Sequence, residues 1–201
     1  MEILQSIYAS AKGQSWIEWV VLITGLLYVI LAARESIWCW FWGIISCSFL
    51  AYATYYFYQL QLDALLQIFY VIMGFIGLYR WRYGGQQQAE LRIRRMSAGE
   101  HLRLITLGII LSLAFGYFFD NYTSAAATYL DASTTMFSVI ATFLVIGKRL
   151  ENWLYWIVVD MVYVYLYSSR EAWLFALLLF IYTIIAVFGY LEWRKRYQDI
   201  A

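Results

Sequence analysis

Seven mostly apolar segments follow one another along this chain of 201 residues, and short polar stretches separate them. A helix needs about 20 mostly apolar residues to cross the roughly 30 Å hydrocarbon layer of a membrane. The chain is 64% hydrophobic and only 13% charged, whereas a soluble domain is about half apolar and a quarter charged. The sequence therefore predicts an all-α integral membrane protein with seven transmembrane helices, at 17–33, 37–58, 62–81, 102–119, 132–147, 152–168 and 172–192.

The basic residues between these segments predict how the chain is oriented. With seven spans, one side of the membrane receives 12 of the 14 lysines and arginines. The other side receives only Lys12 and Arg170. Because loops rich in Lys and Arg stay in the cytoplasm, we expect the N-terminus outside and the C-terminus inside.

The longest polar stretch, RYGGQQQAELRIRRMSAGEH at 82–101, has two interpretations. One is a solvated cytoplasmic linker whose charges set the topology. The other is a binding site for anionic lipid headgroups, which clustered Lys and Arg residues attract at a membrane surface.

The remaining reactive residue types do not favour an enzyme. A single histidine, His101, cannot supply two axial haem ligands and does not favour a metal centre. Cys39 and Cys47 lie within one apolar segment and are expected to be packed or lipid-facing thiols rather than a disulfide. The sequence has no Ser/His pair, phosphate-binding loop or large soluble domain, so we expect no cofactor, no nucleic-acid partner and no sensory role.

The segment 64–82 is similar to the segment 176–194. At a constant offset of 112 residues, eight of 19 positions are identical, and both segments end in Gly-x-x-x-Trp-Arg. This similarity predicts two parallel three-helix repeats joined by a linker helix, which is the 3+1+3 plan of the SWEET transporters. In such transporters the substrate site lies between the repeats, near the membrane midplane.

An offset of 114 residues extends the similarity more weakly to the second and sixth helices. It aligns Trp42 with Trp156 and Ser46 with Asp160. The predicted organisation is a first repeat at 1–81, a cytoplasmic loop with the linker helix (102–119) and an outer loop at 82–131, and a second repeat with a cytoplasmic tail at 132–201.

The sixth segment carries a carboxylate close to two tryptophans, in the stretch ENWLYWIVVD at 151–160. Trp153, Trp156 and Asp160 are spaced i, i+3 and i+7, which places them on one helical face. At 1.5 Å per residue, Asp160 lies about 12 Å from the helix start, near the membrane midplane. A charge at that depth costs roughly 2.5–3.5 kcal/mol, so we expect Asp160 to face a wet cavity or a cationic partner.

The two indoles suggest what that partner is. Indole faces stack on flat rings and attract cations, each contact contributing about 0.5–2 kcal/mol. Together with Asp160, they predict a site for a flat, positively charged small molecule. The tryptophans alone are also typical of the aromatic belt at a membrane interface.

Further polar side chains are candidates for the same substrate-binding cavity, namely Ser46, Gln67, Ser138, Thr142 and Asn152. The alternative for the hydroxyl groups is ordinary packing between membrane helices. Trp38, Trp40 and Trp42 are expected in the interfacial belt. Gly74 and Gly77 are expected to permit close helix packing.

The stretch ENWLYWIVVD resembles the motif Trp-x-x-Trp-x-x-x-Asn of the PnuC vitamin transporters. The segment Tyr70…Gly77…Trp81 and the opening SWIEWVVLITGLLYVILAARES at 15–36 are similar to the same family, and the likeness covers essentially the whole chain. The resemblance implies substrate contacts at Trp153, Trp156 and the third motif position. That position is Asp160 here, whereas the nicotinamide riboside carriers have asparagine.

The resemblance also implies a function: facilitated diffusion of a water-soluble B vitamin or precursor across the bacterial cytoplasmic (inner) membrane, by alternating access. Members carry nicotinamide riboside, sibling branches carry thiamine or riboflavin, a cytoplasmic kinase traps the substrate, and members can be homotrimers. Since nicotinamide riboside and thiamine are cations, Asp160 favours these two over riboflavin. The alternatives are a proton-coupled transporter using Asp160 and a non-transport membrane subunit.

Overall fold

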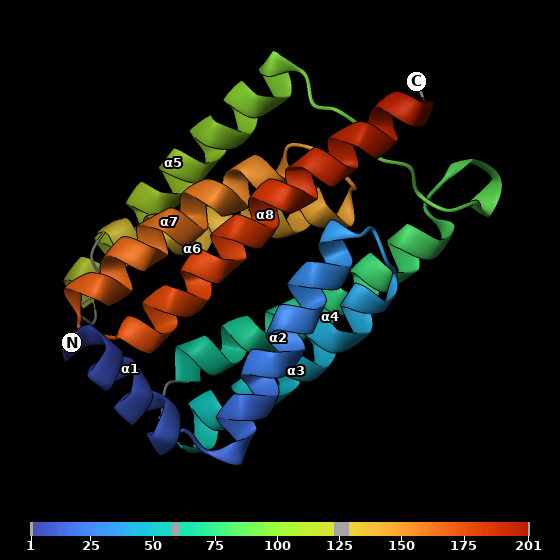
Figure 1. Cartoon of the computed structure of the whole chain (residues 1–201). Helices are drawn as coiled ribbons and strands as arrows, with labels where there is room; N and C mark the ends of the chain where they lie inside the picture. The colour runs from blue at the N-terminus through green and yellow to red at the C-terminus, as the bar shows by residue number, and fades with distance from the viewer. Residues whose placement is uncertain (1, 58–60, 123–128, 201) are drawn as a thin grey trace.

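The computed structural model of the protein describes residues 2–57, 61–122 and 129–200, which form eight α-helices and one short 3-10 helix (Figure 1). The helices are α1 (Glu2–Gly13), α2 (Trp16–Ala33), α3 (Trp38–Tyr56), α4 (Gln61–Tyr83), α5 (Ala98–Tyr122), α6 (Tyr129–Ile146), α7 (Asn152–Ser169) and α8 (Trp173–Ile200), and the 3-10 helix is Gln86–Gln88.

The helix ends differ from the expectation at both termini of the chain. The N-terminal helix α1 was not expected; it is too short to cross a membrane and packs on α8. Helix α8 continues to Ile200 instead of ending near residue 192, because neither Pro nor Gly follows Trp193 and Arg196 pairs with Glu192 one turn earlier at 3.0 Å.

Five of the described helices are both long and apolar enough to cross a membrane: α2, α4, α5, α6 and α8. Helices α3 and α7 have similar lengths, but their Trp, Tyr and other polar side chains lower the mean hydropathy. The chain is thus a helical multi-pass membrane protein, while the expected number of seven spans is not confirmed by helix length and hydropathy.

The helices pack in two groups of three. In the first triplet α2 contacts α3 and α3 contacts α4, and in the second α6 contacts α7 and α7 contacts α8. Helix α5 packs on the outside of α6, and the triplets meet where α2 contacts α8 and α4 contacts α6 (Figure 1).

Matching hydrogen bonds join the two triplets at one end of the bundle. The indole Nε1 of Trp81 on α4 donates to the carbonyl of Val145 at the end of α6, at 3.0 Å. The indole Nε1 of Trp193 on α8 donates to the carbonyl of Ala32 at the end of α2, also at 3.0 Å. Each triplet therefore binds the other through the same pair of elements.

The turns after α2 and α6 are also alike. Glu35 and Lys148 both have a positive φ, of 59° and 46°, and their backbone amides donate to Ala32 and Val145, at 2.9 Å in each case. These counterparts are 113 residues apart. The same offset of 113 residues relates Trp40 to Trp153. It differs by one residue from the offset of 114 that aligns Ser46 with Asp160. At an offset of 113, the counterpart of Asp160 is Cys47.

The polar stretch before α5 is not a solvated linker throughout. Leu91 and Ile93 are buried, and the amide of Leu91 donates to the carbonyl of Trp81 at 3.1 Å. Arg94 and Arg149 form an isolated bridge of parallel β type. The alternation of Leu91 and Ile93 with arginines thus lets this stretch lie along the helix ends with its apolar side inward.

Candidate substrate-binding cavity

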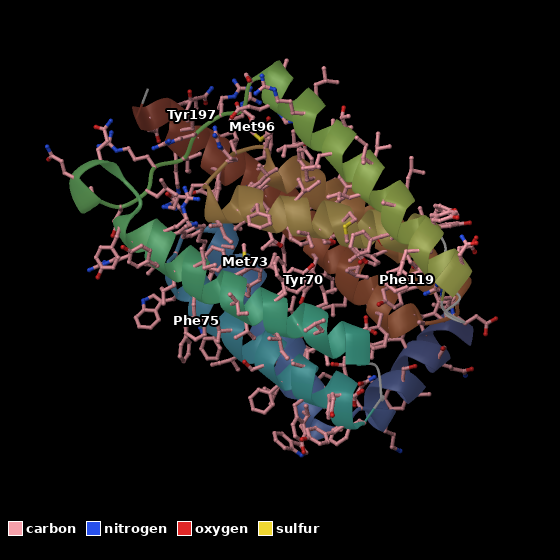
Figure 2. All side chains as sticks on the ribbon, turned by 180° about the vertical axis from the view of Figure 1, so that it is seen from behind. Tyr70, Met73, Phe75, Met96, Phe119 and Tyr197 are labelled. Carbon is pink, nitrogen blue, oxygen red and sulfur yellow. The ribbon has the colours of Figure 1, made fainter. Side chains whose placement is uncertain are left out.

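A cavity of about 370 Å³ lies between the two triplets, and side chains from all six of their helices line it. Figure 2 shows Tyr70 and Met73 at the seam between α4 and the opposite triplet, whereas Phe75 on the same helix points away from it. The volume falls in the range of about 300–1,000 Å³ that is usual for small-molecule sites.

Asp160 of α7 lines this cavity. The residue is 5% exposed. Its carboxylate forms no hydrogen bond or ion pair with any described residue. A buried charge normally has a partner, so the cavity offers an uncompensated acceptor for a cation.

The two tryptophans of α7 differ in their surroundings. Trp153 is buried and packs edge-to-face on Trp193, with 5.5 Å between the ring centroids. Trp156 is half-buried and also lines the cavity. Because Trp153 is already held by protein contacts, Trp156 has the indole with more surface left for a ligand.

Four other predicted residues line the same cavity: Ser46, Gln67, Ser138 and Thr142. The three hydroxyl groups donate to backbone carbonyls, Ser46 to Val21 across the α2–α3 contact and the other two within α6. A hydroxyl that already donates still has lone pairs, so these oxygens can accept hydrogen bonds from a ligand. Gln67 is half-buried at the far end of the cavity.

Two expectations need correction. Asn152 does not line the cavity; it is fully buried at the start of α7, where its Nδ2 donates to the carbonyl of Arg149 at 2.6 Å. Trp40 is not in an interfacial belt; it is 3% exposed and lines the cavity, because Gly77 on α4 leaves room for its ring. Trp38, two residues earlier, is 65% exposed.

Sequence reasoning did not select the tyrosines that surround the cavity, which are Tyr28, Tyr70, Tyr163 and Tyr182. They add phenol rings and hydroxyl groups from α2, α4, α7 and α8. The identity of Tyr70 and Tyr182 in the internal repeat was the available signal. Gly25 on α2 accommodates the Tyr182 hydroxyl, which would lie 2.6 Å from a Cβ at that position.

A chain of four indoles closes the cavity at the end where the triplets exchange hydrogen bonds. Ring centroids lie 5.3 Å apart between Trp40 and Trp81, 5.8 Å between Trp81 and Trp193, and 5.5 Å between Trp193 and Trp153. Trp40 and Trp153, the two of these four indoles that line the cavity, are buried, whereas Gln67 and Tyr163 near the other end are half-buried. The cavity is therefore closed at the indole end.

An ion pair between the triplets lies beside the same indoles. Lys148 Nζ is 2.6 Å from Glu35 Oε1, and the lysine side chain is only 6% exposed. The ammonium group also lies 4.7 Å from the centre of the Trp81 ring, and Arg196 approaches Glu35 at 3.4 Å. We call this end of the bundle, with Glu35, Lys148, Arg149 and Arg196, the basic end.

The helical membrane fold and the central cavity between two similar triplets define a membrane transport protein. The chain belongs to the nicotinamide mononucleotide transporter family, whose model matches residues 15–195. It is accordingly a PnuC-type membrane transporter and not an enzyme.

Several relatives are similar over most of the chain. The nicotinamide riboside transporter PnuC of Escherichia coli is 28% identical, over 92% of this chain and 87% of its own length. That of Neisseria mucosa is 27% identical, over 96% and 77%. The riboflavin/roseoflavin transporter RibM of Streptomyces davaonensis is 24% identical, over 90% and 85%.

A solved structure has the same fold. The crystal structure of the vitamin B3 transporter PnuC superimposes with a TM-score of 0.73 and 24% sequence identity. The match covers 96% of this chain and 88% of that one.

Proposed function

We propose that this chain takes up a cationic B vitamin or vitamin precursor by facilitated diffusion across the bacterial inner membrane. The observation that carries the proposal is Asp160, a carboxylate without a protein partner among the described residues, which lines a cavity beside Trp156. A cation with a flat ring complements both groups, through charge and through stacking on the indole.

The transport unit is proposed to be the 3+1+3 arrangement, with α2–α4 and α6–α8 as repeats and α5 as linker. The reciprocal hydrogen bonds of Trp81 and Trp193 and the paired turns at Glu35 and Lys148 support two equivalent halves. The basic end is proposed to face the cytoplasm, because it gathers the Lys- and Arg-rich segments.

In this arrangement the substrate enters from the outer side and the basic end is closed. Opening requires the triplets to part where the four indoles and the Glu35–Lys148 pair now hold them together. The substrate then leaves into the cytoplasm, where phosphorylation by a kinase traps it and removes the need for an ion gradient. A trimeric assembly stays a prediction.

Nicotinamide riboside is the first candidate substrate, because the PnuC relatives are named for it. Thiamine is the second, because a carboxylate at position 160 suits its cationic ring as well. Riboflavin is the substrate named for one relative, but it is uncharged and would leave Asp160 buried without a counter-charge.

The direct test is calorimetric titration of the purified protein with nicotinamide riboside, thiamine and riboflavin. We expect saturable binding of at least one of the two cations and weaker binding of riboflavin. Binding of riboflavin alone, or of none of the three, would overturn the proposed substrate class.

Proton coupling is the alternative mechanism, because Asp160 has no ion-pair partner among the described residues. Uptake of the bound vitamin into proteoliposomes that contain no kinase distinguishes the two mechanisms. With the membrane potential held at zero by a potassium ionophore and equal potassium on both sides, facilitated diffusion of a cation stops when the inside and outside concentrations are equal, with or without a pH gradient. Accumulation above the outside concentration that depends on a pH gradient would assign Asp160 to a coupling proton.

A further inference from the structure

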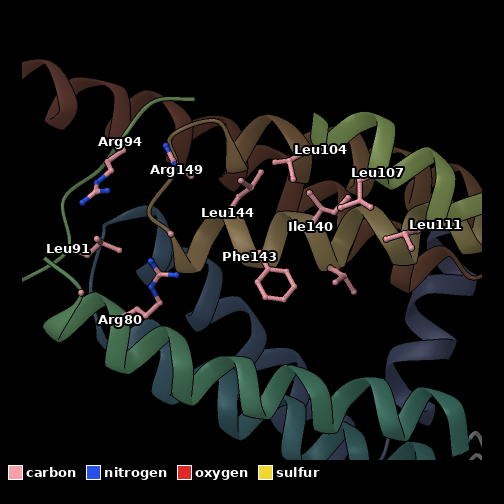
Figure 3. Close-up of a pocket in the computed structure, with 13 residues that line it drawn as sticks. Arg80, Leu91, Arg94, Leu104, Leu107, Leu111, Ile140, Phe143, Leu144 and Arg149 are labelled. Carbon is pink, nitrogen blue, oxygen red and sulfur yellow. The ribbon is translucent and has the colours of Figure 1, made fainter. Parts of the chain in front are cut away.

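A second cavity, of about 390 Å³, opens beside the linker helix and shares no lining residue with the substrate cavity. Figure 3 shows Arg80, Arg94 and Arg149 gathered at one end of it, while Leu104, Leu107, Leu111, Ile140 and Phe143 line the remainder along α5 and α6. One end of this cavity is thus lined by charged side chains, and the rest of its length is lined mainly by apolar ones. We call it the arginine groove.

Two of the three arginines have no carboxylate partner among the described residues. Arg149 pairs with Glu100 at 3.1 Å. Arg80 and Arg94 have exposed side chains, and no described carboxylate lies within ion-pair distance of either. The groove therefore has an excess of positive charge at its polar end and attracts an anion.

The backbone holds the polar end in place. The amide of Arg94 donates to the carbonyl of Lys148, and the amide of Leu150 donates to the carbonyl of Arg94, both at 2.9 Å. Arg80 lies on α4, so its Cα is fixed by a helix of the first triplet. A ligand that binds both Arg80 and Arg94 meets a preformed site between the triplets.

The apolar part of the groove faces the surroundings of the bundle. Leu107 is 47% exposed and Phe143 is 54% exposed, on helices that are apolar enough to span a membrane. From Leu104 to Leu111 the wall runs for about 10 Å at 1.5 Å per residue. Hydrocarbon chains, rather than water, complement such a surface.

We propose that the arginine groove binds an anionic phospholipid, with the phosphate between Arg80 and Arg94 and one acyl chain along Leu104, Leu107 and Leu111. The proposal rests on the proposed topology, which puts the basic end at the cytoplasmic leaflet, where anionic headgroups attract arginines. A free phosphate ion would use the polar end alone and leave the apolar walls unoccupied. The bound lipid bridges the first triplet and the segment that packs against the second.

The test is lipid retention by the full-length protein, measured by native mass spectrometry after purification in detergent. Phosphatidylglycerol and phosphatidylcholine with identical acyl chains are added in equal amounts. We expect a preference for phosphatidylglycerol that the variant Arg80→Gln/Arg94→Gln lowers by roughly 30-fold, since each arginine near an anionic lipid contributes about fivefold. The matched control is Arg92→Gln/Arg103→Gln, which removes two exposed arginines outside the groove and should keep the preference.

A second variant tests the apolar wall. Leu107→Trp fills the groove and should lower phosphatidylglycerol retention while leaving binding of inorganic phosphate unchanged. Equal losses in the groove variant and the control variant would overturn the proposal. Displacement of the lipid by inorganic phosphate at the same concentration would also overturn the proposal. So would a protein dimer that forms through the groove, binds no lipid there and dissociates in the Leu107→Trp variant. Vitamin binding by the same variants reports separately on the substrate cavity, so either proposal can fail alone.

Discussion

Asp160→Asn separates the charge of the cavity from its shape. Asparagine has nearly the same volume as aspartate, so the cavity of about 370 Å³ keeps its walls. Asp160 has no hydrogen-bond or salt-bridge partner among the described residues, so the substitution breaks no hydrogen bond or ion pair there and removes a buried charge. We therefore expect the melting temperature of the unliganded protein to stay the same or to rise.

The effect on binding follows from the Coulomb energy of the lost charge. Two unit charges 4 Å apart attract by about 1 kcal/mol in bulk water and about 4 kcal/mol at an effective dielectric constant of 20. The cavity is closed at the basic end and less buried at the other end, which places it between these limits. We expect a loss of about 1.4–2.8 kcal/mol, or roughly 10- to 100-fold in Kd.

The assay compares nicotinamide riboside with its reduced form, which has a similar size and shape but an uncharged ring. Calorimetric titration of each ligand against the wild-type protein and against Asp160→Asn gives four Kd values. They separate the effect of the ligand charge from the effect of the charge at residue 160. Asp160→Asn should weaken the cation by the stated factor and leave the uncharged ligand within about threefold. Equal weakening of both ligands, or unchanged affinity for the cation, would refute Asp160 as the counter-charge.

Three further substitutions test the indoles and their packing. Trp156→Ala should weaken binding by about 0.5–2 kcal/mol in a titration, because it removes a stacking surface, whereas Trp38→Ala, outside the cavity, should not. Gly189→Ala should destabilise the protein by about 1–3 kcal/mol, because the new Cβ would lie 2.8 Å from the Trp153 ring, whereas Gly13→Ala meets open space and should be neutral in thermal unfolding. Lys148→Gln should lower the melting temperature, because it leaves Glu35 with Arg196 alone, and an unchanged value would contradict a stabilising role for the pair.

The helices and the α7 site could be predicted because they depend on local sequence. Apolar length determines which segments can span a membrane, and the spacing of Trp153, Trp156 and Asp160 places them on one helical face whatever the tertiary fold. The structure brings these three together with Gln67 and Ser138 in one cavity. These side chains meet because the faces of α4, α6 and α7 that carry them all point toward the cavity.

The tertiary environment of individual aromatic residues could not be predicted in the same way. In a membrane protein both the lipid-facing and the core-facing sides of a helix are apolar, so hydrophobic periodicity does not separate them. Trp38 and Trp40 illustrate this, since one is 65% exposed and the other 3% exposed. Their difference depends on Gly77, which is 37 residues from Trp40 in sequence and lies on another helix. Leu91 and Ile93 were missed because they are buried in a hydrophobic cluster with Ile146 and Leu150, which lie more than 50 residues away in the sequence.

The hydrogen-bonding states of the four indoles affect the stability of the closed basic end. Trp81 and Trp193 donate across the two triplets, whereas the Nε1 atoms of their neighbours Trp40 and Trp153 are buried and have no hydrogen-bond partner in the part of the chain that the structure describes. An unsatisfied buried donor costs about 1–3 kcal/mol. Two such donors at equivalent positions therefore offset part of the stabilisation from the two hydrogen bonds and the Glu35–Lys148 pair. Separation of the triplets would break the hydrogen bonds of Trp81 and Trp193, but water could then bind the Nε1 groups of all four indoles. The closed state is therefore less stable relative to the open state than its contacts alone imply. A transporter that opens at this end requires such a small free-energy difference between the two states.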